Sequence, residues 1–120
     1  MTVLILGASN KPDRYSYKAF KMLQSHGYEV LLVHPILKEI DGVKVFNDVN
    51  DLKGRAIDVV TLYLSAKNSA AYEDLIIAAK PKFVVFNPGT EAPEMRSRIA
   101  AAGIKVKEAC TLVMLGTGQF

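Results

Sequence analysis

An anion-binding site is indicated by one segment near the start of the chain, Gly7-Ala8-Ser9-Asn10-Lys11-Pro12-Asp13-Arg14-Tyr15-Ser16. The segment follows an apolar run, and Gly7 permits a tight exit from that run. The small side chains of Ala8 and Ser9 allow backbone amides to come close to a ligand. A helix that follows such a turn directs its unpaired N–H groups at the same place, where a phosphate group would be stabilised.

Three polar side chains in this segment support the same prediction. Lys11 and Arg14 bring positive charge, and the planar guanidinium of Arg14 matches the geometry of phosphate oxygens. Ser16 can either cap the helix or donate a hydrogen bond to the anion. The alternative is that Gly7 only turns the chain and that water surrounds both cations. We expect a phosphate site here.

The spacing of glycines and acids limits which nucleotide could bind. A dinucleotide fingerprint requires G-x-G-x-x-G after the first strand and an acid at the end of the second. Only Gly7 of that pattern is present, and His34-Pro35 stands where the acid would be, so NAD is disfavoured. NADP could bind through Arg14, but it is only a weak candidate. A Walker loop and the clustered acids of a phosphorelay receiver are absent, which disfavours ATP hydrolysis and phosphorelay.

The secondary structure around this segment alternates along the chain. Short apolar runs rich in β-branched or aromatic residues predict strands at 2–6, 28–33, 58–64, 83–86 and 104–106, with an edge strand at 43–46. Helical spacing relates Ala19, Met22, Leu23 and His26, and likewise Tyr72, Leu75, Ile76 and Ala79. A third helix would contain Met95, Ile99 and Ala102 with Thr90 as its N-cap, and a short helix is expected at 48–52.

This alternation predicts an α/β fold. Because crossovers between parallel strands are right-handed, so short a chain has few other topologies than a doubly wound parallel sheet. We expect a Rossmann-like sheet of five to six strands in a three-layer α/β/α arrangement, with 1–120 as a single domain. Ligands of such sheets bind beyond the carboxyl ends of the strands. The loops to consider are therefore 7–16, 34–38, 63–68 and 87–90.

Composition and charge narrow the class of protein further. The apolar runs are too short to cross a bilayer, and the first residues have the pattern of a strand rather than a signal peptide, so we expect a cytoplasmic protein without a membrane partner. The single Cys110 forms no internal disulfide and is a poor metal site. The net charge of +3 is dispersed, which favours a small polyanion over a nucleic acid.

These residues resemble a family, the small CoA-binding domain proteins related to the CoA-binding domain of the succinyl-CoA synthetase alpha subunit. The resemblance covers nearly the whole chain. It rests on Gly7-Ala8-Ser9 with Pro12, Arg14, Ser16 and Tyr17, on Gly27-Tyr28-Glu29-Val30 leading to Val33-His34-Pro35, on Gly42-Val43-Lys44-Val45-Phe46, on Ile57-Asp58-Val59-Val60, on Asn87-Pro88-Gly89 and on Cys110.

The resemblance implies coenzyme A or an acyl-CoA as the ligand. The family's phosphate-binding loop matches Gly7, Ala8, Ser9, Lys11, Arg14 and Ser16. The adenosine part would lie beside His34 and Pro35, with Lys38 reaching its 3′-phosphate. The loops containing Tyr63, Leu64 and Ser65, and Asn87, Pro88 and Gly89, would line the adenine and the start of the pantetheine arm.

The resemblance also implies a binding module without catalytic residues, because the catalytic parts of such synthetases lie outside this domain. The module would serve as a carrier, a sensor or a subunit of a partner enzyme, and assembly into a homodimer is a further alternative. The alternative is a small NADP-dependent or acyl-transferring enzyme that uses His34 or Cys110. A third interpretation is a domain that has lost its ligand and only contacts other proteins.

Overall fold

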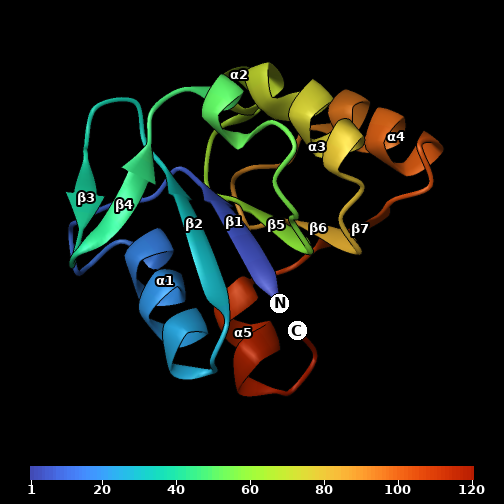
Figure 1. Ribbon diagram of the computed structural model, residues 1–120. Coiled ribbons are helices and arrows are strands. Elements are labelled where there is room, and N and C mark those ends of the chain that lie inside the picture. Colours follow the sequence, from blue (N-terminus) through green and yellow to red (C-terminus); the bar gives the residue numbers. More distant parts are fainter.

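A seven-stranded sheet forms the middle layer of the protein, for which a computed structural model describes all residues 1–120 (Figure 1). The strand order is β3-β4-β2-β1-β5-β6-β7. The parallel strands are β1 (Thr2–Leu6), β2 (Glu29–Val33), β4 (Val43–Phe46), β5 (Val59–Leu62), β6 (Phe83–Phe86) and β7 (Lys105–Glu108). The predicted doubly wound α/β fold is confirmed.

One strand exceeds the predicted five to six. Strand β3 (Glu39–Ile40) pairs antiparallel with β4, so that Ile40 lies opposite Val43. The turn between them is Asp41-Gly42, with φ of 50° and 80°. An Asp-Gly pair adopts this left-handed conformation readily and is a strong hairpin signal. The strand was missed because two residues are too few to show a period-two pattern.

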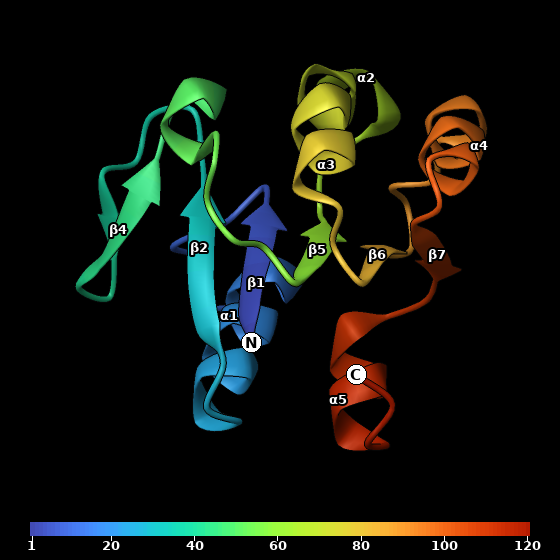
Figure 2. The same cartoon turned by 45° about the vertical axis from the view of Figure 1, so that its right-hand side comes forward.

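Helices cover both faces of the sheet (Figure 1, Figure 2). On one face lie α1 (Tyr15–Ser25) and α5 (Thr111–Gly116). The other face carries α2 (Ala66–Ser69), η2 (Ala70–Tyr72), α3 (Glu73–Ala79) and α4 (Pro93–Ala101), together with the 3₁₀ helix η1 (Val49–Leu52). None of the helices combines the length and hydropathy required to span a membrane.

Each helical layer packs on its own hydrophobic core, because successive strand residues point to opposite faces. Leu4 and Leu6 of β1 belong to the core beneath α3 and α4, whereas Val3 and Ile5 belong to the core beneath α1 and α5. All the residues of β1 after Thr2 are fully buried. The central strand is thus fixed from both sides, and its carboxyl end is a rigid platform.

Two helix starts test the sequence-based assignments. The side chain of Asp48 accepts a hydrogen bond from the amide of Asn50, which confirms the short helix at 48–52. The prediction of Thr90 as the N-cap of the third helix is wrong, because α4 begins at Pro93. The Thr90 hydroxyl instead donates to the carbonyl of Asn87, at 2.7 Å, and closes the turn after β6.

Candidate functional site

The winding direction of the sheet reverses between β1 and β5, and the two chain exits meet there. Gly7 has a φ of 94°, and a Cβ atom at this position would lie 3.0 Å from the carbonyl carbon and oxygen of Tyr63. Only glycine fits both the backbone conformation and the close approach. The sequence predicted the tight exit at Gly7. The structure shows why glycine is needed there, because the backbone of Tyr63, just after β5, lies against it.

A cavity of about 560 Å³ opens at this reversal point, at the carboxyl ends of β1, β2 and β5. It collects side chains from the loops after these strands and from the first turn of α1. Its lining residues are Gly7, Ala8, Ser9, Asn10, Lys11, Arg14, Tyr15, Ser16, His34, Pro35, Leu37, Tyr63 and Leu64. The first-loop and second-loop residues named from the sequence, apart from Lys38, therefore share one cavity.

The start of α1 leaves its amide groups open towards this cavity. Arg14 occupies the cap position and makes no side-chain cap hydrogen bond, and no acidic residue lies in the first turn. The amides of Tyr15, Ser16 and Tyr17 donate to no protein atom. The positive end of the helix dipole is thus uncompensated, which favours an anion at this place.

Ser16 is the polar side chain that this arrangement leaves without a partner. The residue is only 6% exposed, lies in the first turn of α1 and lines the cavity. Its hydroxyl has no hydrogen-bond partner in the protein and is not enclosed by protein atoms, so it can donate to a ligand oxygen in the cavity. Of the two roles predicted for Ser16, the structure disagrees with capping, since Arg14 precedes the helix.

Lys11 and Arg14 supply the positive charge. Both line the cavity, and the ion pairs of the protein involve other cations, Lys21, Arg96 and Arg98. Neither the ammonium group of Lys11 nor the guanidinium group of Arg14 is neutralised by a carboxylate of the chain. Both are therefore available to an anionic ligand.

The sequence led us to expect backbone amides near a ligand at Ala8 and Ser9, and the amide of Ala8 is not free for this. The amides of Gly7 and Ala8 both donate to the carbonyl of Val33, at 3.2 and 2.9 Å, and so fasten the first loop to the end of β2. The Ser9 hydroxyl accepts from the amide of Lys11 at 3.1 Å. The amides of Ser9 and Asn10 donate to no protein atom, so the free donors are these two and those of the α1 start, while Gly7 and Ala8 shape the wall.

His34 lines the same cavity and is held by its own loop. Its Nδ1 atom accepts hydrogen bonds from the amides of Ile36 and Leu37, each at 3.0 Å. A neutral imidazole that accepts at Nδ1 carries its proton on Nε2, which then donates. The ring therefore offers a donor to a ligand and holds no free lone pair with which to take a proton.

A second cavity of about 410 Å³ lies between the first turns of α1 and α5. Tyr15 and Tyr63 line both cavities, so the two adjoin. The remaining lining residues of the second cavity are Asn87, Pro88, Cys110, Leu112 and Val113. This wall is mostly apolar, in contrast to the cationic first cavity.

The side chain of Asn87 ties β5, β6 and α5 together. Its Nδ2 atom donates to the Thr61 hydroxyl and the Leu62 carbonyl, at 2.7 and 2.8 Å, and its Oδ1 atom accepts from the amide of Thr111 at 2.9 Å. The hydroxyls of Thr61 and Thr111 are 2.8 Å apart. All these groups are buried. The Asn87 amide is occupied, and the residue fixes the position of α5 beside the site.

Tyr63 has a buried hydroxyl without a hydrogen-bond partner. Burial is the main reason why the pKa of this hydroxyl is raised to about 12, and the nearby hydroxyls of Thr111 and Thr61, which lie outside hydrogen-bonding geometry, offset part of that rise. Tyr63 remains a neutral wall of both cavities at physiological pH.

Three of the residues named from the sequence lie outside both cavities. Lys38 donates to Asn47 Oδ1 at 2.8 Å, Ser65 caps α2, and the amide of Gly89 donates to the carboxylate of Glu91. Sequence reasoning missed the cavity residues Asn10, Leu37, Leu112 and Val113. The first two adjoin named residues, whereas the last two belong to α5, for which no helix signal was found in the sequence.

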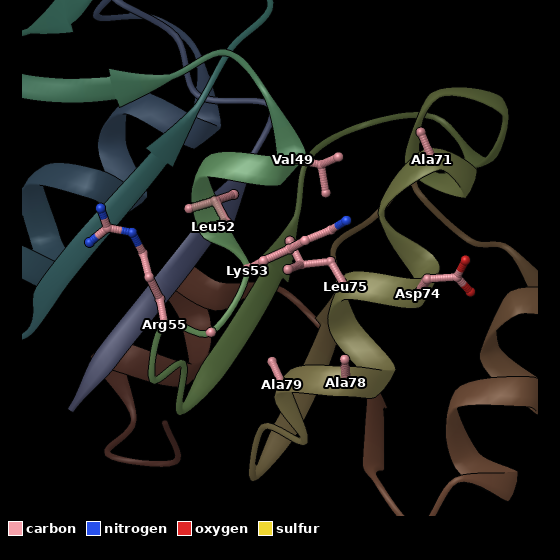
Figure 3. A pocket seen from close by; sticks show the side chains of 10 residues that line it. Val49, Leu52, Lys53, Arg55, Ala71, Asp74, Leu75, Ala78 and Ala79 are labelled. Carbon is pink, nitrogen blue, oxygen red and sulfur yellow. The ribbon is translucent and has the colours of Figure 1, made fainter.

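A larger cavity of about 640 Å³ lies on the opposite face, between η1 and α3 (Figure 3). It exists because the connection from β4 to β5 contains only a short 3₁₀ helix. Its floor consists of Val49, Leu52 and Leu75, and Lys53, Arg55 and Asp74 lie at its rim. It lacks an open helix start, and no group of three or more metal-ligating side chains exists anywhere in the chain. The cavity at the ends of β1, β2 and β5 is therefore the better candidate.

The chain matches a family model described as CoA binding domain over residues 1–116. Among curated proteins it is similar to uncharacterized protein YneT of Bacillus subtilis (strain 168), with 34% identity over 61 residues. These residues are 51% of this chain and 44% of that protein, so the match spans less than half of the relative.

Solved structures share the fold over nearly the whole chain. One, of an uncharacterized protein, has 38% identity and a TM-score of 0.91, and the match covers 99% of this chain and 97% of that one. A hypothetical protein from Pyrococcus horikoshii OT3 has 30% identity and a TM-score of 0.85, with 97% and 81% covered. A dinucleotide forming acetyl-coenzyme A synthetase 1 of Ca. Korarchaeum cryptofilum, at 20% identity and a TM-score of 0.71, shares the fold over 90% of this chain and 25% of its own.

Proposed function

The chain belongs to the CoA binding domain family, and on this basis we propose that the cavity at the carboxyl ends of β1, β2 and β5 binds coenzyme A. The membership confirms the resemblance recognised in the sequence. The diphosphate of the cofactor would lie at the start of α1, and the adenosine would lie beside His34 and Pro35. The pantetheine arm would pass between Tyr15 and Tyr63.

The observation that carries this proposal is the hydroxyl of Ser16, which has no hydrogen-bond partner in the protein and lines the cavity at the uncapped start of α1. Open helix amides, an unused hydroxyl and the unpaired cations Lys11 and Arg14 converge on one cavity. A diphosphate supplies enough acceptor oxygens for all of these donors. A neutral ligand would leave the cations unused.

We also propose that the module binds its ligand without transforming it. A general base needs a free lone pair, and Nδ1 of His34 is occupied by two backbone amides. Cys110 has no histidine or carboxylate among the residues that share its cavity. The acids and nucleophiles that acyl transfer requires are thus not assembled at this site.

Thermal unfolding in the presence of different nucleotides tests the proposal. Coenzyme A at a hundred times its dissociation constant should stabilise the folded protein by roughly 2.7 kcal/mol, with a clear rise in Tm. NADP and ATP at the same concentration serve as controls, because they share the adenosine 5′-phosphate portion of coenzyme A but lack its pantetheine arm. An equal rise with NADP, or no rise with coenzyme A, would contradict the proposal.

A further inference from the structure

The loop at residues 34–38, which follows β2, forms one wall of the proposed coenzyme A cavity. Strands β2 and β4 run parallel and side by side (Figure 1), so the residues that follow them, His34 and Asn47, lie at the same edge of the sheet. The His34 amide donates to a carbonyl of β4 at 3.1 Å, and an amide of β4 donates to the carbonyl of Lys38 at 2.9 Å. The backbone of β4 therefore fixes both ends of the loop.

The side chain of Asn47 closes the middle of this loop. Its Nδ2 atom donates to the carbonyls of His34 and Leu37, at 2.7 and 2.8 Å, and its Oδ1 atom accepts from Nζ of Lys38 at 2.8 Å. A lysine ammonium can only donate, so this contact fixes which end of the Asn47 amide faces the two carbonyls. Of the side chains outside the loop, only that of Asn47 hydrogen-bonds to the loop backbone.

Asn47 does not line the cavity, so it acts on a ligand there only through the loop that it holds. The amides of Ile36 and Leu37 keep Nδ1 of His34 occupied, so that Nε2 carries the proton and can donate to a ligand. These two amides belong to the segment whose carbonyls Asn47 binds. The orientation of the His34 ring in the cavity therefore depends on Asn47.

We propose that Asn47 is a positioning residue for the nucleoside end of coenzyme A. It keeps the loop at 34–38 closed, so that His34 and Pro35 meet the adenosine without a rearrangement on binding. This inference rests on the proposed function, which assigns the adenosine to these two residues. It adds that a residue outside the cavity determines how tightly the nucleoside half binds, whereas binding of the pantetheine half is independent of Asn47.

Calorimetric titration of Asn47→Ala with coenzyme A, adenosine 3′,5′-bisphosphate and 4′-phosphopantetheine tests the inference. The substitution removes both donors to the loop carbonyls, so it should weaken binding of coenzyme A and of adenosine 3′,5′-bisphosphate about tenfold. Binding of 4′-phosphopantetheine should change by less than about twofold, because its contacts are distant from the loop. Asn50→Ala is a matched control, since the Asn50 side chain is exposed and makes no hydrogen bond.

The ratio of the two fragment affinities separates positioning from a general loss of structure. An equal loss for both fragments, or no loss for adenosine 3′,5′-bisphosphate, would overturn the inference while leaving coenzyme A binding intact. Failure of the wild type to bind coenzyme A would overturn the proposed function instead. If Asn47→Ala does not fold, Asn47→Asp decides the matter by the same ratio, because it keeps the Lys38 contact and nearly the same volume but lacks the two donors.

Discussion

Gly7 and Tyr63 approach so closely that a Cβ atom on Gly7 would lie 3.0 Å from the Tyr63 carbonyl carbon and oxygen. This contact joins the exits of β1 and β5 at the point where the winding of the sheet reverses. Tyr63 lines both cavities and Gly7 lines the first, so this contact lies where the two cavities adjoin. The geometry of the site depends on this backbone contact as well as on the polar side chains around it.

Replacing Gly7 by alanine should destabilise the protein by about 2 to 4 kcal/mol, because the new Cβ combines an unfavourable φ with a clash against backbone. Urea unfolding measures the loss. Gly27→Ala is the matched control, since Gly27 has a similar φ of 84° but no atom within 4 Å of the place that a Cβ would take. Equal losses in the two variants would show that the contact with Tyr63 contributes nothing.

Arg14→Ala should weaken coenzyme A binding at least tenfold, because it removes a charge-assisted hydrogen bond of about 1.5 to 3 kcal/mol. The effect should shrink at high salt, since Arg14 is exposed to solvent. Arg96→Ala is a suitable control, as Arg96 pairs with Glu108 away from the cavity. An unchanged dissociation constant for Arg14→Ala would show that Arg14 does not contact the ligand.

Asn87→Ala should cost about 2 to 4 kcal/mol in the free energy of unfolding, because it leaves the buried amide of Thr111 and the buried Leu62 carbonyl without partners. Since Asn87 also holds the start of α5 beside the proposed site, we expect the variant to bind coenzyme A less tightly. Chemical unfolding and calorimetry give the two quantities. A loss below about 1 kcal/mol would mean that other groups replace the network.

Tyr63 should make the stability of the protein depend on alkaline pH. Its pKa is about 12 in the folded state against an ordinary value of 10, so the folded state retains its proton longer. The stabilisation is complete below pH 10 and is lost as pH rises from 10 towards 12. Wild type should lose about 2 kcal/mol more than Tyr63→Phe over this interval, a difference that cancels the effects of the other titrating groups. Parallel curves for the two proteins would contradict the buried hydroxyl.

The sequence predicted the sheet because its strands are continuous apolar runs between glycines and prolines, as at 2–6 and 28–33. It predicted the cationic cavity because strand-end loops meet at one edge of a parallel sheet, whatever their separation along the chain. Strand β3 and helix α5 were not predicted, since neither is long enough to display its period.

Hydrogen-bond partners were the other feature that the sequence could not reveal. Asn87 was expected to line a ligand and does line the second cavity, but the sequence did not show that its buried amide joins three elements. The loop at Ala8 and Ser9 was expected to bring its amides to a ligand, but the amide of Ala8 donates to the carbonyl of Val33 in β2. Such pairings depend on the distance between loops in space, and that distance is fixed only when the whole sheet has assembled.

A crystal structure of the protein with coenzyme A would be the decisive test of the proposed site. We predict that the diphosphate lies at the start of α1, within hydrogen-bonding distance of the Ser16 hydroxyl and the first-turn amides, with Arg14 turned towards it. A cofactor bound instead in the cavity between η1 and α3, or a diphosphate distant from Ser16, would contradict the proposal.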